Sequence, residues 1–460
     1  MTEKISPRVV WSIVATAILG FVGILTETSM NVTFPDLIKQ FGVPMGTVQW
    51  LTTAYLLIVA LMMTTSAYLK AVMSPRKIFI WGMISFVIGD IISIFAPSFW
   101  PLLFGRLIMA VGTGIALPLV FNVILMSIPP MQIGKYMGFG GLILSLAPAL
   151  GPVYGGLVTY WLGWRAIFVI VLPIMLISLV LGWRTLPSEH QAEEASFDWW
   201  QFIVLGVSLT TALLALGELE SGKISATIIV LAVIAVVAMV LFIRIAGKST
   251  KKLLNLSVFK SKGMVFALLI YATSQAINLA VNFAIPQYAQ LTLGATTMIA
   301  GAVLMPGSLL GSISSPMYGA FYDRAGATKP LTIGSITFFV VMVIFSIMAP
   351  SITSIGLTVM YALFTLGRNL AFNTSMTAGV AEVPREVSGD VNAIFNTIQQ
   401  FAGAVGTAVA ALFIKTTSTT PAEIAHQTAT GLGHLFWFST VFAGLSLIWL
   451  FGFTKTKTGK

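Results

Sequence analysis

The chain has 460 residues, of which 57% are hydrophobic and only 9% are charged. Because soluble domains carry about 25% charged residues, this composition excludes a water-soluble globular protein and indicates a polytopic membrane protein. The lack of cysteine excludes disulfides, thiolate metal ligands and cysteine nucleophiles. We also expect no histidine metal centre, because His190, His426 and His434 fall in polar stretches between apolar runs.

Fourteen apolar runs are long enough to cross a bilayer, since a spanning helix needs roughly 20 apolar residues. Helices are expected because isolated strands cannot satisfy their backbone hydrogen bonds in lipid. The first run is too long for a signal peptide and lacks its cleavage site, so we expect a mature helix there. In chain order the runs cover residues 9–34, 47–69, 78–97, 99–128, 136–160, 165–183, 199–217, 224–246, 264–290, 297–320, 330–349, 352–380, 388–414 and 434–453.

Basic residues are distributed unevenly between the two sides of the predicted spans. If both termini are cytoplasmic, the inner loops and tails hold 19 Lys and Arg residues, whereas the outer loops hold only Lys39, Arg165, Lys223 and Lys415. This asymmetry follows the positive-inside rule and predicts a multi-pass protein of a cell membrane with both termini in the cytoplasm. The net charge of +10 then reflects contact with anionic membrane lipids and requires no nucleic-acid partner.

The chain contains an internal repeat. The segment Ala96–Ser98 recurs at Ala349–Ser351, and Gly151 recurs at Gly406, at offsets of 253 and 255 residues. Because this offset exceeds half the chain length, we expect two extra helices between the halves. The predicted fold is an all-α membrane protein with 14 transmembrane helices, arranged as two pseudo-symmetric six-helix bundles plus two inserted helices. The predicted domains are residues 1–185, the linker and inserted pair at 186–262, and residues 263–460.

Several motifs resemble those of the major facilitator superfamily, in particular its fourteen-helix drug:proton antiporters. The fifth span carries the most specific one, which resembles the antiporter motif and contains Pro148, Gly151, Pro152, Gly155 and Gly156. The proline removes a backbone donor and bends the helix, and the glycines permit close helix approach. The antiporter assignment itself comes from the resemblance.

Three further spans carry matching residues. The first contains Glu27 and Asn31 before Pro35, and the fourth contains Gly105-Arg106. The thirteenth resembles the lincomycin-type multidrug exporter subgroup at Asn396, Gln399 and Gln400.

This resemblance implies a proton-coupled multidrug efflux antiporter that exports amphipathic or cationic compounds by alternating access. The implied partners are protons, small drugs and membrane lipids, and the implied state is a monomer in a bacterial plasma membrane. No cofactor and no metal are expected. An enzyme is disfavoured because no nucleophile–base set or metal-ligand set falls within the spans. A proton-coupled transporter of one specific small metabolite remains the alternative.

The cytoplasmic loop motif of the family departs from its pattern in the first half. After the second span, Ser66, Lys70 and Met73 stand where the family has Gly, Asp and Gly. The second copy is intact, and a latch at this loop would depend on it. It consists of Gly319, Asp323, Arg324, Gly326 and Lys329.

Three charged residues fall inside spans of the first half, namely Glu27, Asp90 and Arg106. Each lies seven or eight residues from the expected outer end of its helix, so we expect one layer at roughly 10–12 Å depth. Carboxylates inside a bilayer are costly and usually functional. We interpret Glu27 as the proton carrier, against a structural hydrogen bond as the alternative. Asp90 is either a second titrating group or the counter-ion of Arg106.

The second half offers amides and one cation at depth. Gln275, Asn278 and Asn282 form a stripe on one face of the ninth span, and an offset of 255 residues matches Glu27 to Asn282. These amides, with Asn31 and those of the thirteenth span, are candidates for the substrate cavity or for interhelical packing. Arg368 in the twelfth span binds an anionic substrate group, binds a carboxylate, or locks two helices together; the sequence leaves these interpretations open.

Overall fold

The computed structural model describes residues 5–189, 196–219, 225–249, 253–384, 387–414 and 420–458. Within these ranges the chain is helical and forms no β-strand. Several helices begin at a serine or threonine whose side chain accepts a hydrogen bond from the first turn, as Ser6, Ser74, Ser225, Ser261 and Thr353 do.

The first bundle consists of the helices before residue 186. Their bounds are α1 (Pro7–Phe41), α2 (Met45–Val48), α3 (Trp50–Thr64), α4 (Ser66–Val72), α5 (Pro75–Ile94), α6 (Phe99–Ser127), α7 (Ile133–Leu162) and α8 (Arg165–Thr185). Helices α5 and α6 pack on each other, and α1 packs on α6, α7 and α8.

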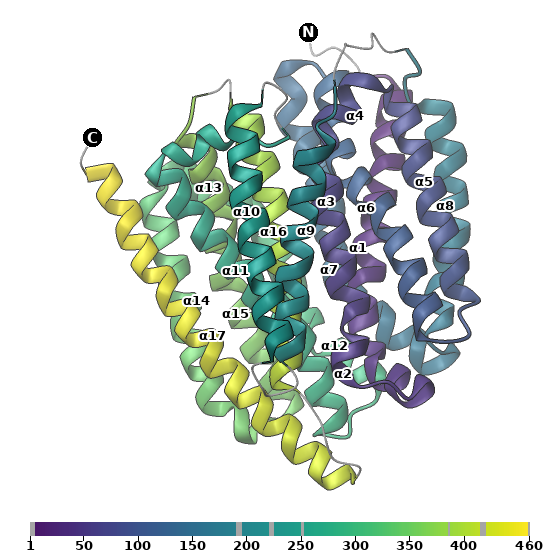
Figure 1. Cartoon of the computed structure of the whole chain (residues 1–460), viewed down its shortest axis with the longest axis vertical. Helices are drawn as coiled ribbons and strands as arrows, with labels where there is room; N and C mark the ends of the chain where they lie inside the picture. Colours follow the sequence, from purple (N-terminus) through teal and green to yellow (C-terminus); the bar gives the residue numbers. More distant parts are fainter. Residues whose placement is uncertain are drawn as a thin grey trace.

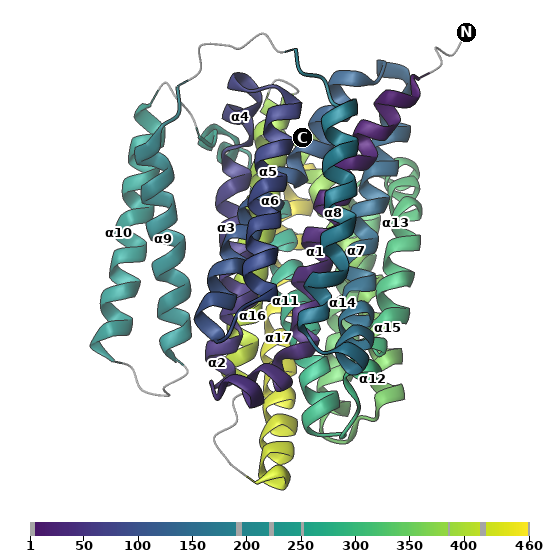
Figure 2. The same cartoon turned by 90° about the vertical axis from the view of Figure 1, so that its right-hand side faces the viewer.

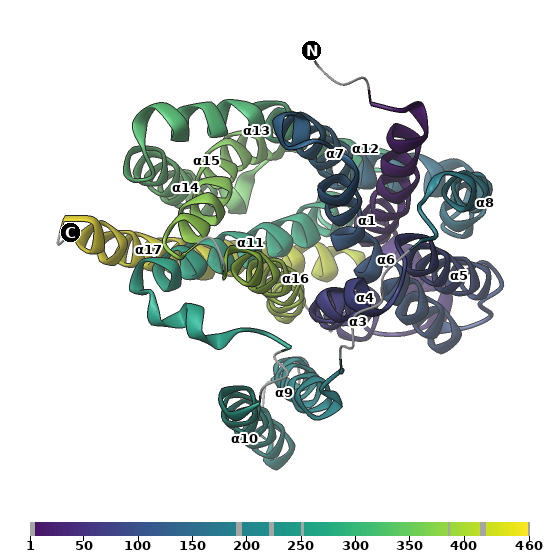
Figure 3. The same ribbon diagram turned by 90° about the horizontal axis from the view of Figure 1, so that it is seen from above.

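The second bundle contains the helices after residue 261. Their bounds are α11 (Lys262–Leu291), α12 (Thr297–Ala302), α13 (Met305–Ala325), α14 (Thr328–Met348), α15 (Ser354–Ala381), α16 (Ser388–Phe413) and α17 (Pro421–Thr458). Helix α11 is central to it and packs on α15, α16 and α17. Seen from above, the two bundles lie side by side (Figure 3).

The inserted pair lies outside both bundles. It consists of α9 (Trp199–Glu218) and α10 (Ala226–Lys248), which stand apart from the other helices in Figure 2. Helix α9 contacts α3 of the first bundle and α16 of the second. Leucines of α9 and α3 share one buried cluster with Ala404 of α16, so the pair covers the seam between the bundles on that side.

Thirteen helical segments in the described ranges are long and apolar enough to cross a membrane. The remaining predicted span coincides with α16, a helix of 26 residues whose sequence contains Asp390, Asn392, Asn396, Gln399 and Gln400. The prediction of an all-helical fold with two bundles and an inserted pair is therefore confirmed. The exact domain boundaries stay a prediction.

Helix α1 begins and α17 ends toward the upper end of Figure 1, which we call the terminal face. The opposite end, where α2 and α12 lie, is called the distal face. Of the basic residues used to predict orientation, seven lie outside the described ranges: Lys4, Lys223, Lys251, Lys252, Arg385, Lys415 and Lys460.

Two helices are longer than the sequence predicted. Helix α1 continues through Pro35 to Phe41 and ends at Gly42, whose φ of 65° is in the left-handed region. The last helix begins at Pro421 instead of residue 434, because Gly431 there packs against the backbone of Phe413. His426 and His434 consequently lie on a helix, and the prediction that they sit between helices was wrong; His190 lies outside the described residues.

The loops that carry the repeated motif are also shorter than predicted. Residues Ser66–Val72 form α4, and Gly319 lies within α13. The two halves turn differently after these helices. Gly326 has a φ of 71°, which suits glycine, whereas Met73 in the first half is extended with a φ of −132°. Where Met73 replaces the glycine, the backbone after α4 is therefore extended and does not form the left-handed turn that follows α13.

The tenth predicted span is divided into α12 and α13. Pro306 lies in the first turn of α13 and has no N–H to donate to the carbonyl of Ala302, four residues earlier. The helix is interrupted at Val303 and Leu304 for this reason. The short α12 is thereby free to pack against both α7 and α11.

Candidate functional site

Glu27 lies on the buried side of α1. Its side chain is 6% exposed, and no residue that the structure describes donates a hydrogen bond to its carboxylate. The guanidinium of Arg106, on α6, is the basic group within electrostatic range. Ionising a carboxylate in such a place costs a large amount of solvation free energy. The residue therefore has the surroundings expected of a group that exchanges a proton.

Arg106 is fully buried and rests on the ring of Tyr55 in α3, with its Cζ atom 4.1 Å from the ring centroid. The Tyr55 hydroxyl is fixed by Thr113, 2.6 Å away, and by the carbonyl of Gly23, to which it donates across 3.0 Å. Nη1 lies 4.0 Å from the sulfur of Met109, whereas Nε and Nη2 have no hydrogen-bond partner in the part of the chain that the structure describes. The guanidinium is thus positioned by an aromatic ring and keeps two nitrogens available.

Asp90 is completely buried on α5, and neither carboxylate oxygen has a hydrogen-bond partner among the described residues. Arg106 is within electrostatic range of Asp90, but the two side chains form no direct hydrogen bond. The predicted counter-ion contact is therefore absent from this conformation. Helices α5 and α6 approach each other closely at Gly89 and Gly105, beside Asp90 in the sequence.

The depth prediction for these three residues needs one correction. It takes Pro35 as the end of the helix that carries Glu27, whereas α1 continues to Phe41. Fourteen residues follow Glu27 in α1, which at about 1.5 Å per residue is roughly 21 Å of helix. Arg106 nevertheless lies within electrostatic range of both carboxylates, so the three residues form one cluster.

Asn31 holds three helices together. Its Oδ1 accepts a hydrogen bond from Thr52 of α3 at 2.8 Å, and its main-chain carbonyl accepts one from Nε2 of Gln287 in α11 at 2.6 Å. Pro35 explains the second contact, because it lacks the N–H that would otherwise bond this carbonyl. Gln287 was not predicted from the sequence, although the proline four residues after Asn31 was a signal for it.

The polar stripe of α11 is divided between two partners. Asn282 donates to the carbonyl of Asn278 at 2.8 Å and accepts from the hydroxyl of Tyr361 in α15 at 2.9 Å. Gln275 accepts a hydrogen bond from Arg368. Both asparagines remain partly exposed.

The internal prolines change the correspondence between the two halves. Glu27, Asn31 and Pro35 of α1 match Asn278, Asn282 and Pro286 of α11 at one spacing of 251 residues, and both prolines lie inside their helices. The offset of 255, which matched Glu27 to Asn282, is one helical turn out of register here.

Arg368 lies near the middle of α15 and is 7% exposed. It donates from Nε to the carbonyl of Ser274 at 3.2 Å, from Nη1 to Asn369 at 2.7 Å, and from Nη2 to Gln275. Its guanidinium lies over the ring of Phe372 at 4.1 Å. All its hydrogen-bond acceptors within the described ranges are uncharged.

The amides of α16 differ in their contacts. Gln399 accepts a hydrogen bond from Tyr271 at 2.6 Å, and the Tyr271 ring stacks on Phe372 at 4.1 Å. Asn396 donates to the carbonyl of Asn392 in its own helix at 2.9 Å. Gln400 is 8% exposed. The tyrosines that complete these networks were missed, because aromatic residues in a membrane span are too common to single out.

The glycines of α7 bring the two bundles together. A Cβ atom on Gly156 would lie 2.5 Å from the carbonyl of Thr297 at the start of α12, and one on Gly155 would lie within 3 Å of the backbone of Ser29 in α1. Ser29 also donates to the carbonyl of Gly151 at 2.9 Å. Pro148 and Pro152 lie inside the same helix. The motif therefore forms the close contact of α7 with α1 and α12.

The terminal half of α7 is much less enclosed. A Cβ atom added to Gly134, Gly138 or Gly141 would meet no atom of the described residues within 4 Å, and the same holds for Gly319 of α13. Ser312 donates to the carbonyl of Ser145 near the middle of the two helices. Helices α7 and α13 thus join the two bundles in their distal and middle parts.

The second copy of the loop motif lies on the surface of the terminal face. Asp323 and Arg324 are exposed at the end of α13, and Lys329 is exposed at the start of α14. None of the three forms an ion pair with another described residue. In the first half, Arg76 instead donates from Nε to the carbonyl of Leu186, after α8, at 2.9 Å.

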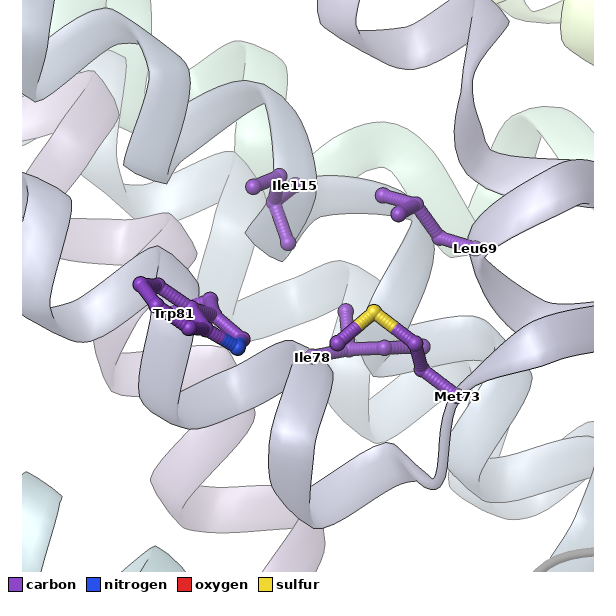
Figure 4. A pocket seen from close by; sticks show the side chains of 5 residues that line it. All are labelled: Leu69, Met73, Ile78, Trp81 and Ile115. Carbon is purple, nitrogen blue, oxygen red and sulfur yellow. The ribbon is translucent and has the colours of Figure 1, made fainter. Parts of the chain in front are cut away.

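A separate apolar pocket of about 250 Å³ lies in the first bundle beside α4, and Figure 4 shows the side chains that line it. It is lined by Leu69, Met73, Ile78, Trp81 and Ile115. Because it contains no charged or hydrogen-bonding acceptor group, it does not belong to the charged cluster.

Comparison with known proteins identifies similar sequences and folds. A family model described as the Major Facilitator Superfamily matches residues 16–407. The chain is 31% identical to the lincomycin resistance protein LmrB of Bacillus subtilis, covering 95% of this chain and 94% of that protein. It is 24% identical to the riboflavin transporter RibZ of Clostridioides difficile, covering 86% and 87%. A crystal structure of a peptide transporter POT in complex with sulfate has a TM-score of 0.68 at 13% identity, covering 95% of this chain and 94% of that one.

Proposed function

Because the chain belongs to the Major Facilitator Superfamily, and is therefore a membrane transporter of small molecules and not an enzyme, we propose that it is a proton-coupled exporter of amphipathic compounds. Relatives named as lincomycin resistance proteins, matched over nearly their whole length, support the drug-export part of this proposal. The observation that carries the proton coupling is the buried carboxylate of Glu27, which has no hydrogen-bond donor among the described residues and lies within electrostatic range of Arg106.

Glu27 carries the proton in this mechanism. When the residue is protonated it is neutral, and when it releases the proton its charge must be balanced by Arg106, by water or by a bound cation. A cationic substrate and a proton then compete for one carboxylate, which couples export of the substrate to entry of the proton. Asp90 is a second proton site of the same cluster.

Alternating access follows from the way the bundles touch. Contacts of α1 with α11 and of α7 with α12 close the distal half. Rocking of one bundle against the other would exchange this closure for one at the terminal face. With the terminal face in the cytoplasm, as the distribution of basic residues predicts, the less enclosed terminal parts of α7 and α13 face inward, and we infer an inward-facing conformation. The chain acts as a monomer in a bacterial plasma membrane.

The substrate contacts that we propose in the second bundle are amides. Asn278 and Asn282 of α11 and Gln400 of α16 supply uncharged hydrogen-bonding groups, which suit compounds of varied shape. The alternative is transport of one small metabolite. A relative named as a riboflavin transporter supports this alternative.

Everted membrane vesicles test the proposal. Wild-type protein should accumulate ethidium when the vesicle interior is acidified, and a protonophore should abolish the accumulation. Glu27→Gln should lose this accumulation while still exchanging ethidium across the membrane without a proton gradient. Glu423→Gln is the matched control, because Glu423 is exposed in the first turn of α17.

Three outcomes would count against it. Undiminished proton-driven uptake by Glu27→Gln would remove Glu27 from the mechanism. If the protonophore does not change dye uptake by the wild type, transport is not coupled to protons. Tight binding of one polar metabolite together with no binding of cationic dyes would favour the alternative.

A further inference from the structure

Arg368 differs from the other buried arginine of the described chain in having no opposite charge nearby. Arg106 has Glu27 and Asp90 within electrostatic range. The neighbours of Arg368 are the Ser274 carbonyl, Gln275, Asn369 and aromatic rings, and no carboxylate of the described residues is among them. The interpretation of Arg368 as a carboxylate partner within the protein is thereby set aside, which leaves a helix lock or an anionic ligand.

A lock between helices explains the hydrogen bonds but not the charge. A neutral amide would also join α15 to α11, and it would avoid the cost of placing an uncompensated cation inside a bilayer. Buried charges are normally paired. A guanidinium held here without a counter-ion is therefore suited to a partner that arrives from outside the protein.

The guanidinium is arranged to receive such a partner. Of its five N–H groups, three are used by Ser274, Asn369 and Gln275, so two remain. Phe372 supports one side of its plane and is itself stacked on Tyr271. A planar guanidinium fixed in this way matches the two oxygens of a carboxylate.

Glu27 and Arg368 come from opposite bundles and from similar depths. The internal prolines match Glu27 to Asn278, and Gln275, which holds Arg368, lies three residues or about one turn from Asn278. The first bundle therefore contributes a negative group and the second a positive group at corresponding levels of their matched helices.

The proposed transport exchanges a substrate for a proton at Glu27, and this direction of exchange restricts the charge that the substrate can carry. A purely anionic substrate would be repelled by ionised Glu27 and favoured by protonated Glu27, so it would travel together with the proton. A substrate with a cationic and an anionic end would compete with the proton at Glu27 and still bind Arg368.

We propose that Arg368 is the subsite for a carboxylate of the transported compound, and that the substrates include zwitterionic amphiphiles whose cationic end faces Glu27. This inference rests on the proposed export function for its assignment of substrate, but the binding of a carboxylate at Arg368 is measured without any proton gradient.

Norfloxacin and its ethyl ester form a suitable pair of probes, because they share the cationic piperazine and differ in the free carboxylate. Binding to purified protein in detergent, above neutral pH, is measured by fluorescence anisotropy. Wild-type protein should bind norfloxacin more tightly than the ester. Arg368→Gln should weaken norfloxacin binding by roughly tenfold or more, as expected for loss of a charged hydrogen bond, and should leave ester binding within about twofold. Arg368→Lys should recover part of the difference.

The comparison of the two probes on wild-type protein needs no variant and stands even if a substitution impairs folding. The proposal is overturned if wild-type protein binds the ester as tightly as norfloxacin, or binds neither. It is also overturned if folded Arg368→Gln loses both probes equally, which is the result expected of a helix lock. Failure of proton-driven transport, with carboxylate-dependent binding intact, would refute the proposed function and leave the subsite in place.

Discussion

Gln287 donates a hydrogen bond of 2.6 Å to the main-chain carbonyl of Asn31, the carbonyl that Pro35 leaves without a helical partner. The contact joins α11 of the second bundle to α1 of the first in the distal half of the molecule. Its neighbour Gln290 donates to the next carbonyl, that of Val32, at 2.8 Å. Gln287 thus supplies from a side chain the donor that the proline removes from the backbone, and Gln290 adds a second contact at the next residue.

Loss of the Gln287 side chain should therefore be costly. We expect Gln287→Leu to lower the free energy of unfolding by about 1–3 kcal/mol, because a buried carbonyl is left unsatisfied. Thermal unfolding in detergent measures this change. The control is Gln290→Leu, whose effect should be smaller, since the Val32 carbonyl still faces the helical N–H of Asp36. Equal melting temperatures of wild type and Gln287→Leu would contradict the assignment.

The glycines of α7 predict opposite effects at two positions of one helix. Gly156→Val places a side chain against the backbone of Thr297, so α7 and α12 would have to separate. We expect this variant to lose most of its dye export, roughly tenfold or more, since overpacking of this kind costs about 1–3 kcal/mol. Vesicle transport and distal accessibility to a membrane-impermeant reagent measure the effect.

The control for this experiment is Gly138→Ala, in the open terminal half of the same helix. An alanine there meets no atom within 4 Å, and replacing a helical glycine should stabilise the protein by about 0.5–1 kcal/mol. If Gly138→Ala were as damaging as Gly156→Val, flexibility of α7 and not its packing would be the property that matters.

Much of this molecule can be predicted from its sequence because lipid makes charge and polarity informative. Glu27, Arg106 and Arg368 stand out in apolar helices, and the spacing of Gln275 and Asn278 is enough to define one face of a helix. The surroundings of each residue are harder to predict. They depend on how each helix is rotated about its axis, which the sequence does not specify, and so it gives no sign of Tyr55 beneath Arg106 or of Phe372 beneath Arg368.

Errors in the prediction arise where local signals conflict with packing. Pro35 is typical of a helix end, whereas Gln287 satisfies the carbonyl that it frees, and α1 continues. The polar residues after Pro421 are typical of a loop, although their small and apolar members pack on α16.

Asp90 offers a prediction about the charged cluster. Because neither of its oxygens accepts a hydrogen bond here, Asp90→Asn should keep the free energy of unfolding within about 1 kcal/mol of the wild type or raise it. Thermal unfolding tests this point, and proton-driven dye uptake tests separately whether the residue exchanges protons. A large loss of stability would mean that Asp90 is ionised and paired with Arg106 in the dominant state. Ser85→Ala, which removes a hydrogen bond to Ile108 between the same two helices, calibrates the size of a structural effect.

The last prediction uses a contact between the bundles that does not involve the charged cluster. The hydroxyls of Thr53 in α3 and Thr407 in α16 lie 2.9 Å apart in the distal half. The natural chain has no cysteine, so the double variant Thr53→Cys/Thr407→Cys carries only the introduced pair. Side chains this close fall within the range that a disulfide can bridge. We expect oxidation to link them, to hold the distal half closed and to stop transport, and reduction to restore it. Each single variant controls for the substitutions themselves. A linked protein that still transports at the wild-type rate would show that this seam does not open during the cycle, and that rocking of the two bundles is not the mechanism of access.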